Sequence, residues 1–320
     1  MNPLKTLSIL LALICCLSIG SAYATGDAPS ELTGRLKTPY FDVHYDRSDP
    51  FMAKLMADTA HDELMRVSRD LGYTPPKGRP FSLYVYLTHV GFIRAGGLET
   101  SKFTVGTANS GNETLSVDAS GAFALPEEVL AHEITHAVIF RILGPNVGTL
   151  PLWFNEGLAK HESDDFRADD EQTIADAASN GELISLDDLR VAFPKDRTGL
   201  AYAESTSAVK YVIDKHGKSA PKKLLRELAR IGSFDEAARR TIGVTGEQIA
   251  DDWYAKTTRR YWQVRLGRVA MAVVSALMAV LVVVAFLVRR KQKMEAAKAW
   301  EWEEFEERMR RQLGDDPRGR

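Results

Sequence analysis

The sequence predicts an α+β fold in which a small mixed β-sheet with one helix precedes a mainly helical half and a single C-terminal transmembrane helix. Three observations support this prediction. Short apolar and aromatic segments separated by turn residues occupy the first half, helical periodicity dominates from residue 126 onward, and an uncharged run of 20 residues lies near the C-terminus.

Composition sets few limits on function. The chain has 320 residues, of which 45% are hydrophobic and 26% are charged, and these proportions are ordinary for a globular protein. The formal net charge of −2 argues against nucleic acid as the main partner, because binding to the phosphate backbone calls for a basic surface. Evidence for a function must therefore come from particular residues.

The first 24 residues predict a secretory signal peptide. The basic residue Lys5 precedes an apolar run, and the small residues Ala22 and Ala24 are typical of a cleavage site after Ala24. An uncleaved membrane anchor is the alternative, and under both interpretations the domain after this segment is exported. The only cysteines, Cys15 and Cys16, lie inside the apolar run, so the mature chain would have no disulfide and no thiolate ligand.

The run from Val269 to Val288 predicts a transmembrane helix. It has 20 residues, no charge and one polar side chain, Ser275, and this length is enough to cross the hydrocarbon core. Basic residues flank both ends, so their charge does not fix the orientation, and the signal peptide decides it. We expect an exported domain on the periplasmic or extracellular side, one span of the cell membrane and a cytoplasmic tail.

The first half is expected to alternate strands with one long helix. Apolar or alternating segments predict the strands, and an amphipathic pattern that stops at Thr74, Pro75 and Pro76 predicts the helix. The expected strands are 40–45, 81–87, 103–107 and 113–117, with a helix over 51–71 and a turn at 109–112.

The second half is expected to be helical. Pro126 with two glutamates is typical of a helix start, and Gly144 with Pro145 is typical of a helix end, so the pattern predicts a helix over 126–143. Another helix is expected after Pro151, and the remaining ones are expected over 205–215, 221–231, 234–241 and 246–258.

Residues 132–136 form the pattern H-E-x-x-H within the expected helix. Residues four apart on a helix share a face and lie about 6 Å apart along its axis, so His132 and His136 can bind one ion. Neutral imidazole is a good zinc ligand, and Glu133 can reach a water molecule on that ion. Two histidines that share a face without a metal remain the alternative at this point.

A second motif, residues 153–159, supplies a third candidate ligand. Nineteen residues separate His136 from Glu156, which is expected on the next helix. A catalytic zinc ion has three protein ligands and one open position, and two histidines with one glutamate form a known set. We therefore predict that His132, His136 and Glu156 bind Zn²⁺ and that Glu133 is the general base.

These two motifs resemble those of the gluzincins, the thermolysin-like zinc metallopeptidases, and more closely those of the peptidase MA-like family. The string W-F-N-E-G-L-A is also similar to the glutamate-ligand motif of the zinc aminopeptidases. The resemblance is strong over 125–162 and implies a zincin-like (gluzincin) domain with an active-site helix. It also implies that Glu156 binds zinc and that Glu133 is the base, in agreement with the spacing.

The sequence departs from these families at two places. It lacks the G-x-M-E-N motif with which zinc aminopeptidases bind a substrate amino terminus, and this absence favours an endopeptidase. Lys160 stands four residues after the third ligand, where thermolysin-like enzymes have an aspartate that supports a zinc histidine. The supporting carboxylate is therefore expected elsewhere, with Glu162 and Asp164 as candidates.

The expected function is hydrolysis of peptide bonds in exported or membrane-proximal polypeptides. Tyr202 is the candidate donor to the oxyanion, with simple packing as its alternative. Asn155 is expected to support the local backbone. An edge of the strands between 103 and 117 could receive an extended substrate.

A non-catalytic zinc-bearing binding or chaperone module at the membrane surface is the competing hypothesis for the whole protein, and hydrolysis of a non-peptide amide is a third.

The expected organisation comes from these assignments. A signal peptide precedes the two parts of a peptidase domain, the span and a charged tail. The boundaries are 1–24 for the signal peptide, 25–124 for the N-terminal α/β part, 125–262 for the helical zinc-binding part, 269–288 for the span and 289–320 for the tail.

Overall fold

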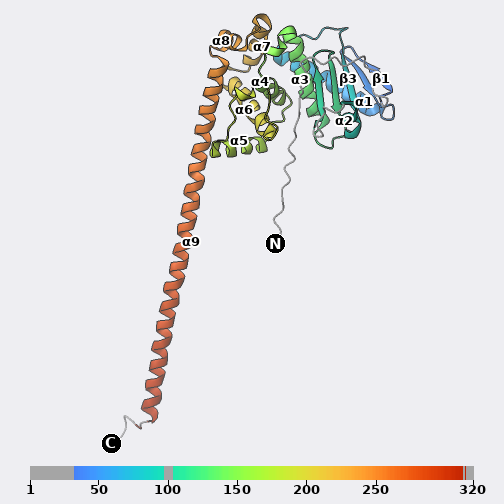
Figure 1. Cartoon of the computed structure of the whole chain (residues 1–320). Helices are drawn as coiled ribbons and strands as arrows, with labels where there is room; N and C mark the ends of the chain where they lie inside the picture. Colours follow the sequence, from blue (N-terminus) through green and yellow to red (C-terminus); the bar gives the residue numbers. More distant parts are fainter. Residues whose placement is uncertain (1–31, 97–103, 313, 315–320) are drawn as a thin grey trace. The chain divides into compact units, whose positions relative to one another are not determined.

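The computed structural model describes residues 32–96, 104–312 and 314. The chain forms two compact units, which divide the sequence between Arg259 and Arg260. The first unit contains the sheet and most of the helices, and the second contains the distal part of one long helix (Figure 1). The expected signal peptide lies outside the described residues.

A five-stranded mixed sheet forms the first part of the first unit. Its spatial order is β1-β2-β3-β5-β4, with parallel pairing in the centre and antiparallel pairing at both edges, so β4 is an edge strand. In chain order the elements are β1 (Gly34–Lys37), β2 (Phe41–Tyr45), α1 (Pro50–Leu71), β3 (Phe81–Tyr86), α2 (His89–Gly96), β4 (Gly106–Asn109) and β5 (Thr114–Asp118).

Alternate side chains of the central strands are buried, because successive residues of a strand point to opposite faces. Phe41, Val43, Leu83, Leu115 and Val117 are almost completely buried in one apolar core. Helix α1 contacts β2, and helix α3 (Pro126–Leu143) contacts β4 and β5. Residues of both helices belong to this core.

Helix α3 (Pro126–Leu143) joins the sheet to the helical part. It begins at a proline followed by Glu127 and Glu128, which interact favourably with the helix dipole, and it ends at Gly144, whose φ is 52°. It packs against β4 and β5 and also against the next helix (Figure 1). The later elements are η1 (Gly144–Thr149), α4 (Leu152–Glu162), α5 (Ala168–Asn180), η2 (Asp188–Arg190), α6 (Thr198–His216), α7 (Ala220–Ile231), α8 (Phe234–Ile242) and α9 (Gly246–Gln312).

Helices α4 and α6 approach each other closely at Gly157. A Cβ atom at this position would lie 2.3 Å from the backbone oxygen of Ser205 and 2.5 Å from its carbonyl carbon, well inside contact distance. The glycine therefore sets the spacing between the helix that carries Glu156 and the helix that carries Tyr202.

Replacing Gly157 by alanine is expected to lower the free energy of unfolding by about 1–3 kcal/mol, because the two backbones must separate to admit a methyl group. Gly148→Ala is the matched control, since a Cβ atom at Gly148 would meet nothing within 4 Å. Urea unfolding of the two variants and the wild type measures the difference. Equal losses in both variants would contradict the packing role of Gly157.

The predicted α+β class, the small mixed sheet and the helix over 126–143 are confirmed. Five elements were not predicted: the strand β1, the helices α2 and α5, and the 3-10 helices η1 and η2. Each is weakly patterned in sequence; α5 has only three buried residues, and β1 has only one.

Several predicted boundaries differ from the structure. The helix that carries Tyr202 begins at Thr198 rather than at residue 205, so Tyr202 lies in its second turn. The strand expected over 103–107 is Gly106–Asn109, although residue 103 lies outside the described residues. The helix expected over 246–258 continues to Gln312, because no proline interrupts it and Gly267 is accommodated within it.

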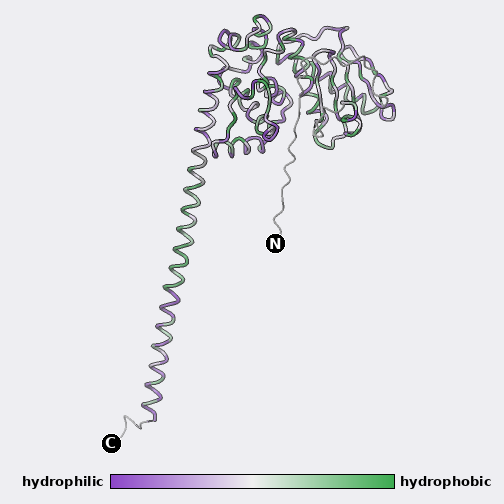
Figure 2. Tube along the Cα trace, viewed as in Figure 1, coloured by the Kyte–Doolittle hydropathy of each residue, from purple (hydrophilic) through white to green (hydrophobic). Residues whose placement is uncertain are grey.

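Helix α9 contains the expected transmembrane segment. The stretch Val269–Gln312 is long and apolar enough to cross a membrane, with a mean hydropathy of 3.0 over its most apolar 18 residues. Figure 2 shows an apolar stretch of α9 followed by a hydrophilic one. Large apolar side chains of this stretch, such as Leu281 and Phe286, are more than 60% exposed.

Candidate metal centre

Helix α3 carries His132, Glu133 and His136 where the sheet and the helical part meet. The histidines are one turn apart, and their side chains lie beside that of Glu156 on α4. All four residues are at most 3% exposed. The sequence therefore places two imidazoles and two carboxylates in a site almost closed to bulk water.

The three predicted ligands come together in the structure. The Nε2 atoms of His132 and His136 lie 3.0 Å apart, and Glu156 Oε2 lies 3.6 Å and 3.5 Å from them, respectively. Two ligand atoms of a tetrahedral zinc ion, each 2.0–2.1 Å from the metal, are about 3.4 Å apart. The spacing of the three atoms therefore suits one zinc ion.

The protonation of these groups also suits a metal. Burial lowers the pKa of His132, which favours its neutral form. Burial acts to raise the pKa of Glu156, but His136 and His132 outweigh that effect and lower the pKa to about 2. Both Glu156 oxygens lack a hydrogen-bond partner among the described residues, so an ionised carboxylate is left available to a cation.

Glu133 lies between the metal ligands and edge strand β4. A Cβ atom at Gly106 would lie 2.6 Å from Glu133 Oε1, so a glycine is needed for the strand to approach this carboxylate. Neither oxygen of Glu133 has a hydrogen-bond partner in the described part of the chain. Burial raises the pKa of Glu133 to about 8, and a cation held by the adjacent ligands would lower it again.

Asn155 orients the His136 ring. Its Oδ1 atom lies 3.1 Å from His136 Nδ1, and when Nδ1 carries the proton and donates this bond, the lone pair on Nε2 can bind a metal. On its other side, the His136 ring stacks on Phe140. The sequence predicts only backbone support for Asn155, and its contact with the ligand is a finding of the structure.

Glu162, one of the two carboxylates expected to support a histidine, has another partner in the structure. Glu162 binds Arg66, with 2.7 Å between Oε2 and Nη1, and is thereby held on the α1 side of α4. Asp164 lies beyond the end of α4, with its backbone at φ 56°. Lys160, in place of an aspartate, pairs with Asp165 at 2.8 Å.

Replacing Asn155 by alanine is expected to weaken zinc binding about 10–100-fold, because the His136 ring loses the group that fixes its tautomer and orientation. Asn155→Asp keeps an acceptor oxygen, so a smaller loss is expected. Competition with a zinc-chelating indicator measures both affinities. An unchanged affinity in Asn155→Ala would show that this hydrogen bond does not orient the ligand.

Tyr202 lies on the wall of a separate large cavity. It is 6% exposed, and its ring meets Phe193 edge-on with 5.0 Å between centroids. The cavity has a volume of about 650 Å³ and is also lined by Glu128, four residues before His132, but its lining includes none of the three predicted ligands. Ser205 of α6 approaches Gly157 of α4 closely. Tyr202 lies three residues before Ser205, so it is about one helical turn from this contact.

Two functional positions were missed from the sequence. Asn155 precedes Glu156 directly, and its polarity inside an otherwise apolar string was the available signal. Gly106 lies in a short strand, and no local pattern shows which glycine faces Glu133, because that contact joins segments far apart in the chain.

Comparison with known proteins gives a family match. A profile described as the peptidase MA superfamily matches residues 59–258, which is more than half of the chain. Among solved structures, the chain is similar to a mutant of a two-domain M1 zinc metallopeptidase bound to L-arginine, with 15% identity and a TM-score of 0.42. That alignment covers 67% of this chain and 48% of the other, so this chain spans about half its length. No curated protein matched.

Proposed function

Because the chain belongs to the peptidase MA superfamily, we propose that it is a membrane-anchored zinc metallopeptidase that cleaves exported or membrane-proximal polypeptides. The observation that carries this proposal is the cluster of His132, His136 and Glu156 with Glu133 beside it. The ligand atoms of the first three all lie within 4.8 Å of one another. A structural zinc site is closed by four protein ligands and needs no base, whereas this group offers three ligands and a neighbouring carboxylate.

The chain's own residues would perform proton transfer and positioning. When bound, Zn²⁺ supplies a Lewis acid that polarises a substrate carbonyl and lowers the pKa of a water molecule toward about 7. Glu133 accepts the proton of the attacking water and then delivers it to the leaving amine. Tyr202 is the proposed donor to the oxyanion, and Asn155 holds the His136 ring in place.

Strand β4 supports an endopeptidase rather than an aminopeptidase. An aminopeptidase needs a carboxylate to bind the substrate's free amino group, and the strand sequence Gly-Thr-Ala-Asn contains none. An extended peptide added to this edge could continue in both directions past Glu133.

The proposed organisation has the peptidase on the exported side of the cell membrane, periplasmic or extracellular. Residues 25–124 and 125–262 form the peptidase domain, 269–288 cross the membrane once, and 289–320 form a cytoplasmic tail. The apolar composition of this part of α9 supports the span. A reporter fused after Arg290 tests the orientation, and activity of an export-dependent reporter there would overturn it.

The function is tested with the full chain purified in detergent. Elemental analysis is expected to find about one zinc ion per chain, and unfolded casein is expected to be cleaved. A chelator should remove both zinc and cleavage, and added zinc should restore them. Absence of zinc would overturn the metal site. Zinc without cleavage would favour a non-catalytic binding module.

A further inference from the structure

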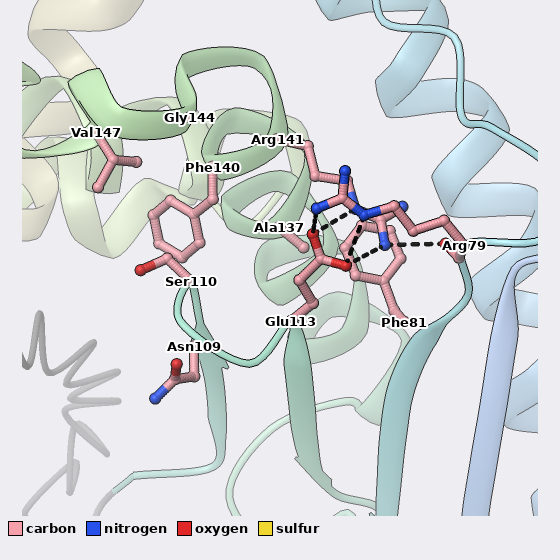
Figure 3. A pocket seen from close by; sticks show the side chains of 10 residues that line it. All are labelled: Arg79, Phe81, Asn109, Ser110, Glu113, Ala137, Phe140, Arg141, Gly144 and Val147. Atoms are coloured by element: carbon pink, nitrogen blue, oxygen red, sulfur yellow. Dashed lines mark hydrogen bonds and ion pairs between the residues drawn. The ribbon is translucent and has the colours of Figure 1, made fainter. Parts of the chain in front are cut away.

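A second, smaller cavity opens beside the C-terminal half of α3 (Figure 3). Its volume is about 270 Å³, and its walls come from α3, the β4–β5 hairpin, the start of β3 and η1. Phe140 and Val147 give it an apolar end, and Arg79, Glu113 and Arg141 give it a charged end. This cavity takes no part in the proposed catalytic chemistry.

The cavity adjoins the candidate metal centre. The ring of Phe140 stacks on that of His136, with 5.9 Å between centroids and 15° between planes. Strand β4 leads to the same place, because it begins at Gly106 against Glu133 and ends at Asn109, which lines the cavity. Three residues of extended chain cover about 10 Å. The cavity therefore lies two or three substrate residues from the bond next to Glu133.

The backbone groups at the edge of β4 determine whether the amino-terminal or the carboxyl-terminal part of a bound peptide lies beside the cavity. Asp118 N donates a hydrogen bond to Val105 O, so the backbone groups of Val105 point toward β5. The backbone groups of successive residues in a strand point alternately to its two sides. Those of Gly106 and Ala108 therefore point away from β5, toward the open edge of the sheet. A peptide added antiparallel, which is the more stable pairing, runs from Asn109 toward Gly106. Its residues on the amino-terminal side of the scissile bond then lie beside the cavity.

The charged end of the cavity has an excess of positive charge. Glu113 lies between the guanidinium groups of Arg79 and Arg141 and binds both (Figure 3). Burial acts to raise the pKa of Glu113, but the two arginines lower it, so the carboxylate is ionised. Two cations thus face one anion.

One of the two cations is poorly solvated, and both have hydrogen-bond donors to spare. The Arg141 side chain is only 4% exposed, with its guanidinium stacked 3.3 Å over the Phe81 ring. The Nη1 atoms of Arg79 and Arg141 donate no hydrogen bond to any residue that the structure describes. A second carboxylate would neutralise this end of the cavity and satisfy those donors.

We propose that this cavity is a substrate subsite that binds the side chain of an acidic residue two or three positions before the scissile bond. The proposal rests on the proposed peptidase function and adds a substrate class to it. Arg79 and Arg141 bind the carboxylate, and Phe140 and Val147 contact the methylene groups that carry it. The apolar end favours glutamate, which has the longer stem, over aspartate.

The test uses the zinc-loaded full chain and a mixture of proteome-derived peptides, with cut sites identified by mass spectrometry. Aspartate and glutamate are expected to be enriched roughly two- to fivefold at the second or third position before the cut, the range for a partly exposed ion pair. Two synthetic peptides that differ only by glutamate or glutamine at the enriched position then give kcat/KM for each. The same ratio is expected between them.

Two pairs of variants assign the preference to the cavity. Ser110 is exposed at the cavity mouth, so Ser110→Glu places a competing carboxylate there, and Ser110→Gln adds similar bulk without charge. Only Ser110→Glu is expected to abolish the glutamate preference. Arg79→Gln should reduce it, whereas Arg230→Gln, which removes an arginine of similar exposure paired with Glu227, should leave it unchanged.

Failure of this subsite and failure of the peptidase function give different results. Cleavage without acidic enrichment, or with enrichment that survives in Ser110→Glu, would overturn the subsite and leave the peptidase intact. Absence of any cleavage by the zinc-loaded chain would overturn the peptidase. In that case fluorescence anisotropy with the labelled glutamate and glutamine peptides still decides the cavity, because equal affinities would overturn its preference for a carboxylate.

Discussion

Replacing Glu133 by glutamine is expected to lower kcat/KM for casein-derived peptides by about 10²–10⁴-fold while zinc stays bound. Glutamine keeps the size of the side chain but cannot accept a proton from water. Zinc should remain bound because Glu133 is not one of the three residues whose ligand atoms cluster, His132, His136 and Glu156. Elemental analysis and a cleavage assay on the same preparation measure both quantities.

The matched control for Glu133→Gln lies on the same helix. Glu127 is exposed in the first turn of α3, so Glu127→Gln removes a carboxylate from that helix without altering the site. Its activity is expected to equal that of the wild type. Full activity with zinc in Glu133→Gln would refute the proposed role of this carboxylate as the base.

Replacing Glu156 by glutamine is expected to weaken zinc binding by more than about 100-fold, the upper range for loss of a group that merely supports a ligand. The amide that replaces Glu156 is neutral, and the site loses its only negatively charged ligand among the three. Activity should disappear together with the metal. Zinc affinity by competition with a chelator, followed by cleavage at saturating zinc, separates lost binding from lost chemistry.

Glu162→Gln serves as the control for Glu156→Gln. Glu162 lies at the end of the same helix and binds Arg66, so its loss should leave zinc affinity within a few-fold of the wild type. Retention of wild-type zinc affinity in Glu156→Gln would remove Glu156 from the ligand set. A large loss in Glu162→Gln would instead restore that residue as a supporting carboxylate.

The ligands could be predicted from the sequence because their geometry is set by local structure. His132 and His136 are one helical turn apart, and Glu156 lies on the helix that follows α3 after a connection of only eight residues, 144–151. Helix α3 was predicted at its observed bounds for the same reason, since its start and stop signals are both strong.

The surroundings of the site could not be predicted, because they depend on contacts between distant segments. Gly106 meets Glu133 across the sheet–helix interface, and Glu113 joins a hairpin tip to Arg141 at the end of α3. Neither contact leaves a periodic pattern in the sequence. The resemblance to thermolysin-like enzymes gave no indication of the contact between Asn155 and His136, since it drew attention to position 160, where Lys160 stands, and to Glu162 and Asp164.

The close approach of Gly106 to Glu133 has a consequence for the order of folding. The three ligands lie on two consecutive helices, so the loop that must close to form the metal site is short and costs little chain entropy. Covering Glu133 requires β4 to be paired with β5 and docked on α3. The loop between Gly106 and Glu133, with 26 residues, is hardly longer than the 19 residues between His136 and Glu156, so the metal site and the strand that covers it are expected to form together.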